Sequence, residues 1–201
     1  VLKELVPQSG MELLADEVYG PKDTDMTAQL TKIKNLGPDA IICWGTNPGP
    51  AVIARNRVQL GIDTPLYMSH GVASKKFIEL AGKASEGLLL PAGRLIVAKQ
   101  LPAGQPQKAI IDTYIKDYKA TYNAPISSFG GYAYDALLLV KKAIEMGNSA
   151  APKDIRDNLE KIKDFKGTGG VFNFSAADHN GLTEDAFEMV VIKDGDWQIV
   201  Q

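Results

Sequence analysis

The stretch GTNPGP at residues 45–50 is the part of the sequence around which the fold can be worked out. It follows an apolar run at residues 40–44 and precedes a run with helical spacing at residues 51–60, which stops at Gly61. A strand, a tight turn and a helix in this order form the loop at which doubly wound α/β proteins bind ligands, because helix N-termini there point free N–H groups into the crevice. The turn alone names no ligand, since a turn of this kind is also a common structural element of α/β folds.

The first half of the chain repeats this strand–helix pattern about every 25 residues. Short apolar runs predict strands at residues 11–15, 40–44, 65–68 and 87–90. Three helices alternate with them: one capped by Thr24 or Asp25 and ended by Gly37, one at residues 51–60, and one opened by Ser74 and closed by Gly82. Continuous apolar strands alternating with helices are typical of a parallel sheet that is covered on both faces.

The second half begins with three helical stripes and no strand between them. They follow a linker that contains Pro102, Gly104 and Pro106. The apolar positions of the first stripe are Ile111, Tyr114, Ile115, Tyr118 and Tyr122, and those of the second are Tyr132 or Ala133, Ala136, Leu137, Val140 and Ile144. The third stripe consists of Ile155, Leu159 and Ile162. Each apolar face must be buried, either on the other helices or on a sheet that this chain does not fully encode. The tail returns to strands, at residues 171–174 and in a hairpin of residues 187–193 and 197–200 around Asp194-Gly195.

Composition excludes several classes of protein. The chain has 201 residues, 45% hydrophobic and 23% charged, with a net charge of −2 and no basic stripe, so we expect a globular protein without a nucleic-acid partner. No apolar run approaches the length of a membrane span. The single cysteine, Cys43, lies in an apolar run and is interpreted as a small buried hydrophobe. The chain opens at Val1 in what resembles the end of a helix, which predicts a mature or truncated product whose export signal has been removed.

A search for catalytic motifs finds none. The sequence contains no phosphate-binding P-loop, no GxSxG, no HExxH and no CxxC pair. Ser69 and His70 are adjacent, but neighbouring side chains on a strand point to opposite faces, which argues against a nucleophile–base pair. The sequence therefore favours a binding protein over an enzyme, with no metal and no cofactor.

Five stretches, taken in order, resemble the periplasmic branched-chain amino-acid-binding proteins, the solute receptors of ABC importers. The matching stretches are DMTAQLTKIKNLGPDAI from Asp25, GTNPGPAVIARNRVQLGI from Gly45, GVASKKFIELAGKASEGLLL from Gly71, SFGGYAYDALLL from Ser128 and FKGTGGVFNFSAADHNGL from Phe165. The resemblance covers nearly the whole chain, and its specificity comes from the ordered set rather than from any one motif.

The resemblance implies an α/β type I periplasmic-binding-protein fold, in which two Rossmann-like lobes with parallel sheets are joined by a hinge. Residues 1–91 and 178–201 would form the second lobe, and residues 92–177 would form the mostly helical C-terminal part of the first lobe. The first lobe would then be incomplete in this chain. Its helices would lack their sheet, so we expect self-association through the exposed apolar stripes.

The function implied by the resemblance is transport without catalysis. The protein would be periplasmic, or extracytoplasmic and membrane-tethered. It would close its hinge on a small ligand and deliver it to an ABC permease in the membrane. Two alternatives stay open, a ligand-sensing domain of a receptor or regulator with the same fold, and an enzyme with a flavodoxin-like lobe.

The ligand-binding residues implied by the resemblance are Trp44, Thr46, Asn47, His70, Gly71 and Phe129. Thr46 and Asn47 would bind a carboxylate beside the helix N-terminus, and Phe129 would contribute an aromatic ring from the first lobe. Each of these also has a purely structural interpretation, as a turn or capping residue or as core packing.

His70 departs from the family pattern. Receptors for leucine, isoleucine and valine have an acidic residue at the matching position, which pairs with the ammonium group of the ligand. An imidazole supplies no negative charge, and a buried ammonium group needs a partner. The hypothesis is therefore an aromatic or aliphatic carboxylate rather than a branched-chain amino acid, unless His70 is a bystander in its loop.

Overall fold

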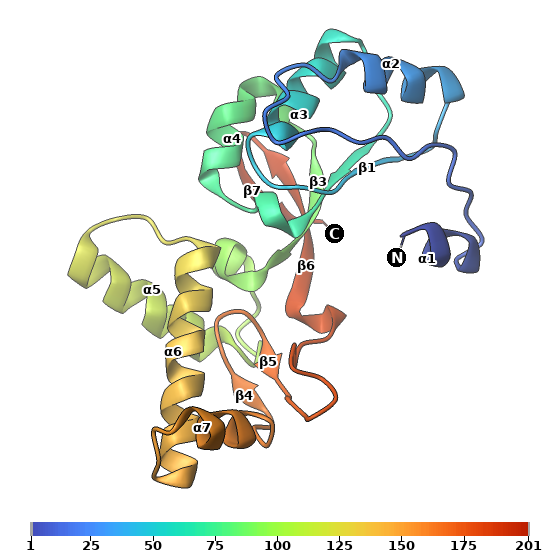
Figure 1. Ribbon diagram of the computed structural model, residues 1–201. Helices are drawn as coiled ribbons and strands as arrows, with labels where there is room; N and C mark the ends of the chain where they lie inside the picture. Colours follow the sequence, from blue (N-terminus) through green and yellow to red (C-terminus); the bar gives the residue numbers. More distant parts are fainter. Residues whose placement is uncertain (1, 201) are drawn as a thin grey trace. The chain divides into compact units, whose positions relative to one another are not determined.

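The computed structural model describes residues 2–200 and shows a mixed α/β protein made of two compact units (Figure 1). Unit 1 comprises the chain up to Leu90 together with Ile192–Asp196. Unit 2 comprises Pro91–Val191 together with the residues from Trp197 onward. The chain therefore passes between the units three times.

One sheet has the strand order β1-β2-β3-β6-β7. β1 (Ile41–Cys43) and β2 (Leu66–Met68) are parallel, with Ile41 opposite Leu66 and Cys43 opposite Met68. β3 (Leu89–Gly93) continues the parallel part, and Leu89 is its residue opposite Tyr67 of β2. The other two strands are β6 (Phe187–Lys193) and β7 (Asp196–Ile199). The parallel strands confirm the α/β class expected from the alternating pattern.

The helices of unit 1 are α1 (Leu2–Gln8), α2 (Thr27–Leu36), α3 (Gly49–Gln59) and α4 (Lys75–Ala81), with short 3₁₀ turns η1 (His70–Val72) and η2 (Gly82–Ser85). Three of them, α2, α3 and α4, lie at the predicted positions, but the predicted cap of α2 is wrong: its N-cap is Met26 rather than Thr24 or Asp25, and the side chain of this N-cap makes no capping hydrogen bond. α2 ends at Gly37 in the left-handed conformation, and α4 begins after Ser74, whose hydroxyl accepts from the backbone N–H of Phe77 at 3.4 Å. Phe77 is the largest fully buried side chain of the protein as described.

The strand predicted at residues 11–15 is wrong. This segment has no regular secondary structure, and Met11, Leu13 and Leu14 are 60%, 40% and 43% exposed. A strand is stable only when its N–H and C=O groups pair with a neighbour. No strand among residues 2–200 pairs with this segment, so its apolar pattern alone does not make it a strand.

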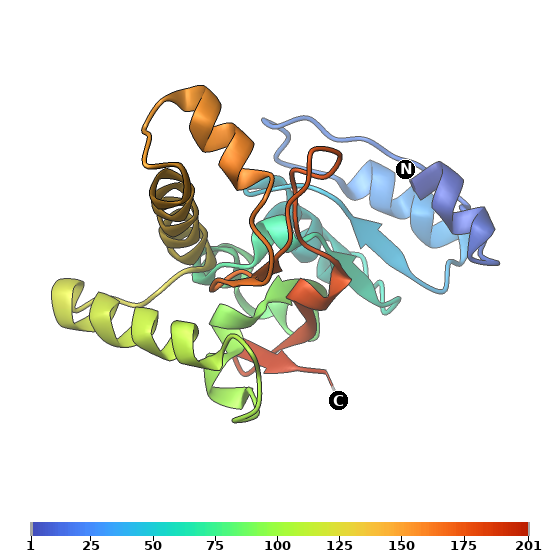
Figure 2. The same cartoon turned by 90° about the horizontal axis from the view of Figure 1, so that it is seen from below.

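Unit 2 is mostly helical (Figure 2). It contains η3 (Arg94–Gln100), α5 (Lys108–Tyr122), α6 (Ser128–Gly147), α7 (Pro152–Leu159) and η4 (Glu184–Ala186). β4 (Phe165–Lys166) and β5 (Val171–Phe172) form a two-stranded antiparallel sheet, of which β4 was not predicted. α6 packs on α7, as both ribbon views show, and Leu139, Ala143 and Ile162 form a small core there.

The buried face of α6 differs from the predicted one. The structure buries Ser128, Gly131, Asp135, Leu139 and Ala143. Of the predicted apolar stripe, Leu137 is 67% exposed and Val140 is 37% exposed. The sequence pattern identified the most apolar stripe, whereas the described structure buries Gly131 and Asp135 against the loop at residues 167–170. Further along the same face, Leu139 and Ala143 pack with Ile162. The apolar stripe therefore has no covering sheet within residues 2–200.

The predicted hairpin turn is confirmed, because Asp194 and Gly195 have φ values of 52° and 71° between β6 and β7. The lobe boundaries inferred from the resemblance, residues 1–91 with 178–201 and residues 92–177, stay a prediction. The two compact units have other bounds, and these bounds do not test the predicted lobes.

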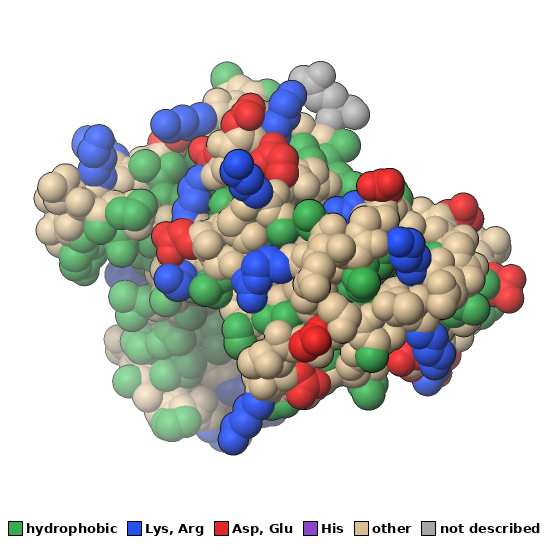
Figure 3. Space-filling model, turned by 90° about the horizontal axis from the view of Figure 1, so that it is seen from above, with side chains coloured by type: hydrophobic (Ala, Val, Ile, Leu, Met, Phe, Trp, Pro, Cys, Tyr) green, Lys and Arg blue, Asp and Glu red, His purple; other side chains and the backbone are tan. Residues whose placement is uncertain are grey.

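The surface is mixed in charge. On the face shown in Figure 3, lysine and arginine side chains are interspersed with aspartate and glutamate, and no single-sign patch is visible. This distribution agrees with the lack of a basic stripe in the sequence. Among the helices described between residues 2 and 200, none combines the length and the apolar character needed to cross a membrane.

Candidate functional site

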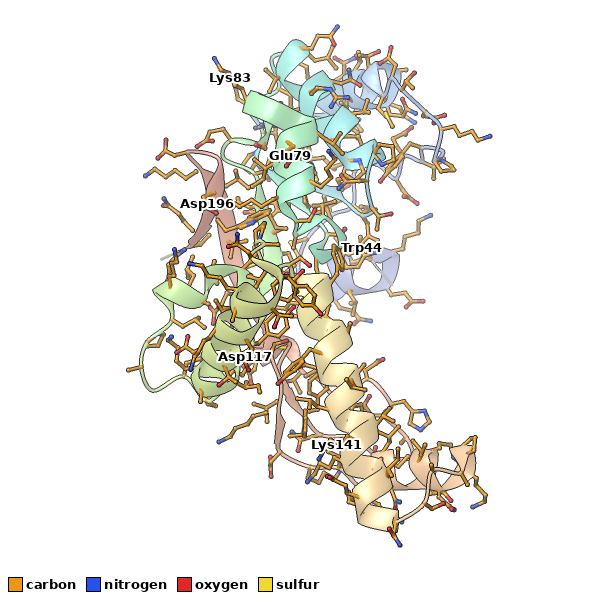
Figure 4. The ribbon with its side chains drawn as sticks, turned by 90° about the vertical axis from the view of Figure 1, so that its left-hand side faces the viewer. Trp44, Glu79, Lys83, Asp117, Lys141 and Asp196 are labelled. Atoms are coloured by element: carbon orange, nitrogen blue, oxygen red, sulfur yellow. The ribbon has the colours of Figure 1, made fainter. Side chains whose placement is uncertain are left out.

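The candidate site lies in unit 1, where β1 ends and the GTNPGP turn begins. The chain leaves β1 at Trp44, whose side chain is 73% exposed (Figure 4). It passes through a cis Asn47–Pro48 peptide bond and enters α3 at Gly49. Pro50 lies in the first turn of α3, where a missing N–H costs no helical hydrogen bond. This order places Thr46 and Asn47 at the carboxyl end of a parallel strand, the edge at which α/β sheets bind ligands.

A second loop, after β2, is fastened to this turn by Ser69. The Ser69 hydroxyl donates to the carbonyl oxygen of Gly45 at 2.7 Å and accepts from the N–H of Gly45 at 3.3 Å. Ser69 is only 5% exposed, so these bonds are shielded from water. Gly71, two residues further on, lies against Thr46, because a Cβ atom at Gly71 would be 3.0 Å from Thr46 Cγ2. The two strand-end loops thus bring Thr46 and Gly71 together.

Asn47 has an unusual feature. Its side-chain oxygen Oδ1 is buried and has no hydrogen-bond partner among the described residues. A buried polar atom without a partner is unfavourable by about 1–3 kcal/mol. A ligand that donates a hydrogen bond at this position would remove that penalty.

His70 begins the 3₁₀ turn η1 directly after Ser69, and its backbone carbonyl accepts from the N–H of Ala73 at 3.0 Å. The side chain is half-buried. Burial lowers the pKa of His70 below its usual value of 6.5, because desolvation disfavours the charged imidazolium. The ring is therefore neutral at pH 7 and provides no charge of either sign for a ligand.

Phe129 belongs to unit 2 and is the second residue of α6. Its side chain is 52% exposed, so it is not a core residue of unit 2. The helix start is well formed, because the Ser127 hydroxyl accepts from the N–H of Gly130 at 3.1 Å. That Phe129 contacts the same ligand as the residues of unit 1 stays a prediction.

Two residues at the site were missed by the sequence analysis as contributors. Ser69 was considered only as a nucleophile, although its position after the neighbouring parallel strand indicated that it would lie near Gly45. Tyr19 gave no such signal, since it comes from an irregular segment 26 residues before Gly45. Its hydroxyl is 3.5 Å from the carbonyl oxygen of Trp44 and 3.9 Å from Cys43 Sγ.

The chemistry available at this edge is hydrogen bonding. It offers a threonine hydroxyl, an asparagine amide and a neutral imidazole. Among residues 2–200, no group of three or more histidine, cysteine, aspartate or glutamate side chains is arranged to hold a metal ion.

A parallel sheet whose strands end in polar loops is typical of the class of α/β ligand-binding proteins. Comparison with known proteins specifies the family. The sequence profile of the periplasmic binding protein family matches residues 1–196, and the chain belongs to this family. The type I fold and the resemblance to branched-chain amino-acid-binding proteins are thereby confirmed.

Three similar proteins illustrate the match. The leucine-, isoleucine-, valine-, threonine- and alanine-binding protein of Pseudomonas aeruginosa is 28% identical over 158 residues, which are 79% of this chain and 40% of that protein. The solved structure of Rp1789 from Rhodopseudomonas palustris matches with a TM-score of 0.91 and 26% identity over 100% of this chain and 58% of that one. The substrate-binding protein LivJ of Streptococcus pneumoniae, solved in complex with isoleucine, matches with a TM-score of 0.73 and 27% identity over 94% of this chain and 52% of that one. The chain thus spans about two fifths to three fifths of these relatives.

Proposed function

We propose that the chain is the C-terminal part of an extracytoplasmic solute-binding protein, periplasmic or tethered to the membrane, that delivers a small carboxylate or amino-acid-like ligand to an ABC permease. Membership of the periplasmic binding protein family supports the solute-binding role. The names of the similar proteins from Pseudomonas aeruginosa and Streptococcus pneumoniae support amino-acid-like chemistry and a transport role.

The observation that carries this proposal is the link between the two strand-end loops, which the Ser69 side chain makes by hydrogen bonding to Gly45. Its two hydrogen bonds to Gly45 hold the backbone that presents Thr46 and Asn47 on one side and His70 and Gly71 on the other. A preorganised set of hydrogen-bonding groups loses little conformational entropy when a ligand binds.

The proposed mechanism is hinge closure without chemistry. A ligand that contacts both lobes binds the closed form more tightly than the open form and so increases the closed population. A shift from 1:99 to 99:1 requires about 10⁴-fold tighter binding to the closed form. Phe129 is the proposed contribution of the first lobe to that preference.

His70 decides which ligand class we propose. A neutral imidazole can hydrogen-bond a carboxylate or a hydroxyl, but it cannot balance the charge of an ammonium group in a partly buried site. We therefore propose a carboxylate without an α-amino group, of which benzoate is a simple aromatic representative.

The test is titration calorimetry of this chain and its His70→Glu variant with benzoate and with L-isoleucine. We expect the unsubstituted chain to bind benzoate more tightly. In His70→Glu, we expect benzoate affinity to fall by about tenfold or more and isoleucine affinity to rise, because the new carboxylate repels an acid and pairs with ammonium. His179→Gln, at the second histidine, is the control and should change neither. Tight isoleucine binding by the unsubstituted chain, or binding of neither probe by the folded chain, would contradict the proposed ligand class.

We further propose that the chain on its own self-associates. Unit 2 has an apolar hollow of about 320 Å³, whose lining residues are Ala136, Leu139, Val140, Arg156, Leu159, Glu160, Phe174 and His179. Leu137 and Val140 are exposed on α6, the helix to which Ala136 and Leu139 of this hollow belong. Contiguous apolar surface of this kind favours association in water.

Sedimentation velocity of the 201-residue chain should therefore show dimers or larger species at micromolar concentration. Leu137→Lys/Val140→Lys should move the distribution toward the monomer, because charge on the apolar face opposes its burial. Lys141→Ala, at an exposed site next to Val140 (Figure 4), controls for a general change of the helix surface. A monomer before substitution would contradict this proposal.

A further inference from the structure

The side chain of Tyr19 packs closely against the GTNPGP turn. Two positions of the turn, Gly45 and Gly49, therefore have no room for a side chain. A Cβ atom at Gly45 would be 1.9 Å from the Tyr19 hydroxyl oxygen and 3.1 Å from ring atom Cζ. A Cβ atom at Gly49 would be 2.4 Å from Cε2 and 3.0 Å from Cδ2 of the same ring. Distances below 3.0 Å are not tolerated between such atoms, so the phenol occupies the space that side chains at both glycines would need.

This contact explains why the turn has glycine at these two places. Neither Gly45 nor Gly49 has a positive φ, so backbone conformation does not require glycine there. Close approach of another group is the remaining reason for a residue without a side chain. The ring of Tyr19 supplies that group for both positions, one on each side of Thr46 and Asn47.

The hydroxyl also contacts the end of β1. It is within donor distance of the Trp44 carbonyl oxygen, at 3.5 Å, and lies 3.9 Å from the sulfur of Cys43. Burial raises the pKa of Tyr19 and raises that of Cys43 to about 11, so both groups are uncharged at neutral pH. The contact therefore acts through shape and neutral hydrogen bonding and does not depend on an ionised group.

We propose that Tyr19 is a positioning residue of the ligand site. Its ring holds the backbone of the GTNPGP turn in the position from which Thr46 and Asn47 contact a bound ligand. The contact itself is independent of the proposed function, whereas its consequence for ligand affinity rests on that function. The position of a hydrogen-bonding group decides binding more strongly than its mere presence, because a misplaced donor loses most of its interaction energy.

The test is a double-substitution cycle in the 201-residue chain. Gly45→Ala is expected to lower the thermal unfolding midpoint by about 3–10 °C, the shift that follows from an overpacked site in a chain of this length. Tyr19→Phe removes the oxygen that is 1.9 Å from the new Cβ and leaves Cζ at 3.1 Å as the nearest atom. The double variant Tyr19→Phe/Gly45→Ala should therefore recover most of the midpoint that Gly45→Ala loses. Gly49→Ala meets the ring itself, so Tyr19→Phe should not rescue it and Tyr19→Ala should.

Two controls separate this from general effects of the substitutions. Gly104→Ala has no atom within 4 Å of the new Cβ and no positive φ, and should leave the midpoint unchanged. Tyr122→Phe removes a hydroxyl from a side chain that is 65% exposed, and should not rescue Gly45→Ala. The inferred close contact between Tyr19 and Gly45 is contradicted if Gly45→Ala is as stable as the unsubstituted chain, or if Tyr19→Phe does not restore the stability that Gly45→Ala loses.

The effect on the turn is read from Trp44, which precedes Gly45. The protein has two tryptophans, so Trp44 emission is isolated as the difference between each variant and the same variant carrying Trp44→Phe. Acrylamide quenching of Trp44 should change in Tyr19→Ala and remain unchanged in Tyr122→Phe. Unchanged quenching in Tyr19→Ala would overturn the positioning role even if the steric cycle behaves as expected.

Benzoate titration then tests the consequence for binding. Tyr19→Ala should weaken benzoate binding by roughly tenfold, equivalent to one misplaced hydrogen bond. If the unsubstituted chain binds no benzoate, the proposed ligand class fails, while the steric cycle and the quenching still decide the role of Tyr19. If benzoate binds equally to both, the positioning role for the ligand is overturned.

Discussion

Replacing Asp135 by alanine is expected to lower the free energy of unfolding of unit 2 by about 2–4 kcal/mol, because it leaves three buried donors unpaired. Asp135 is 1% exposed on the inner face of α6. Its Oδ1 accepts from the N–H of Thr168 at 2.8 Å, and its Oδ2 accepts from the N–H of Gly169 at 2.7 Å and from the Thr168 hydroxyl at 3.0 Å. One carboxylate therefore fixes the glycine-rich loop at residues 167–170.

The same loop is held from its other side by Gln107, which is fully buried. The Gln107 side-chain amide donates to the carbonyls of Gly167 at 3.0 Å and Thr168 at 3.1 Å, and its oxygen accepts from Arg94 at 2.9 Å. Loss of Asp135 weakens a network rather than one bond, so Asp135→Ala and Gln107→Ala should be less than additive. Asp117→Ala, on the exposed face of α5 (Figure 4), is the control and should stay within about 0.5 kcal/mol.

The pH dependence of unfolding gives a second measurement of Asp135. Desolvation raises its pKa above the usual 3.8, and the hydrogen bonds from Thr168 and Gly169 offset only part of this. The folded state therefore holds the proton at pH values where the unfolded state has lost it. The contribution of Asp135 to stability is largest below pH 3.8 and declines as the pH rises through its folded pKa. Asp135→Asn should remove this slope, and a stability advantage of the unsubstituted chain that grows with pH would contradict the assignment.

Phe77→Ala is expected to lower the free energy of unfolding of unit 1 by about 3–5 kcal/mol. Phe77 is 0% exposed in the core beneath α4, and its removal loses buried apolar surface and leaves a cavity. Leu80→Ala, on the same helix at a side chain that is 37% exposed, should lower it by less than half as much.

Urea titration can assign this loss to one unit, because Trp44 lies in unit 1 and Trp197 lies in unit 2. In Trp197→Phe, Trp44 reports unit 1, and in Trp44→Phe, Trp197 reports unit 2. If the units unfold separately, Phe77→Ala should shift the Trp44 transition alone. Equal shifts of both transitions would show that the units unfold as one cooperative structure, and no shift of either would contradict the buried position of Phe77.

The sequence predicted most of the regular structure, because glycine and proline residues occur at the ends of the segments whose apolar patterns predict strands and helices. β1, α3 and the Asp194-Gly195 turn lie where local signals place them. The failures arise where tertiary context decides. The segment at residues 11–15 has a strand pattern but no partner, and α6 buries Asp135 instead of Leu137 because the loop at residues 167–170 needs an acceptor.

The candidate site was predictable only in outline. Thr46 and Asn47 follow from the position of a turn after a parallel strand, which local pattern reveals. Ser69 was in view, but its role depends on the register between β1 and β2, which sequence alone did not fix. Tyr19 was not predictable, because its contact with Gly45 joins two segments through the path of an irregular loop.

The discontinuity of unit 1 has a consequence for how the protein is made. Ile192 is fully buried, and it pairs with Gly87 and Leu88 through backbone hydrogen bonds of 2.8 and 3.0 Å. About 100 residues of unit 2 separate these partners along the chain. A ribosome that adds 5–20 residues per second needs about 5–20 s to synthesise them. Throughout that delay the nascent chain carries β3 with its edge unpaired, so unit 1 reaches its final form only after Pro91–Val191 of unit 2 have been synthesised.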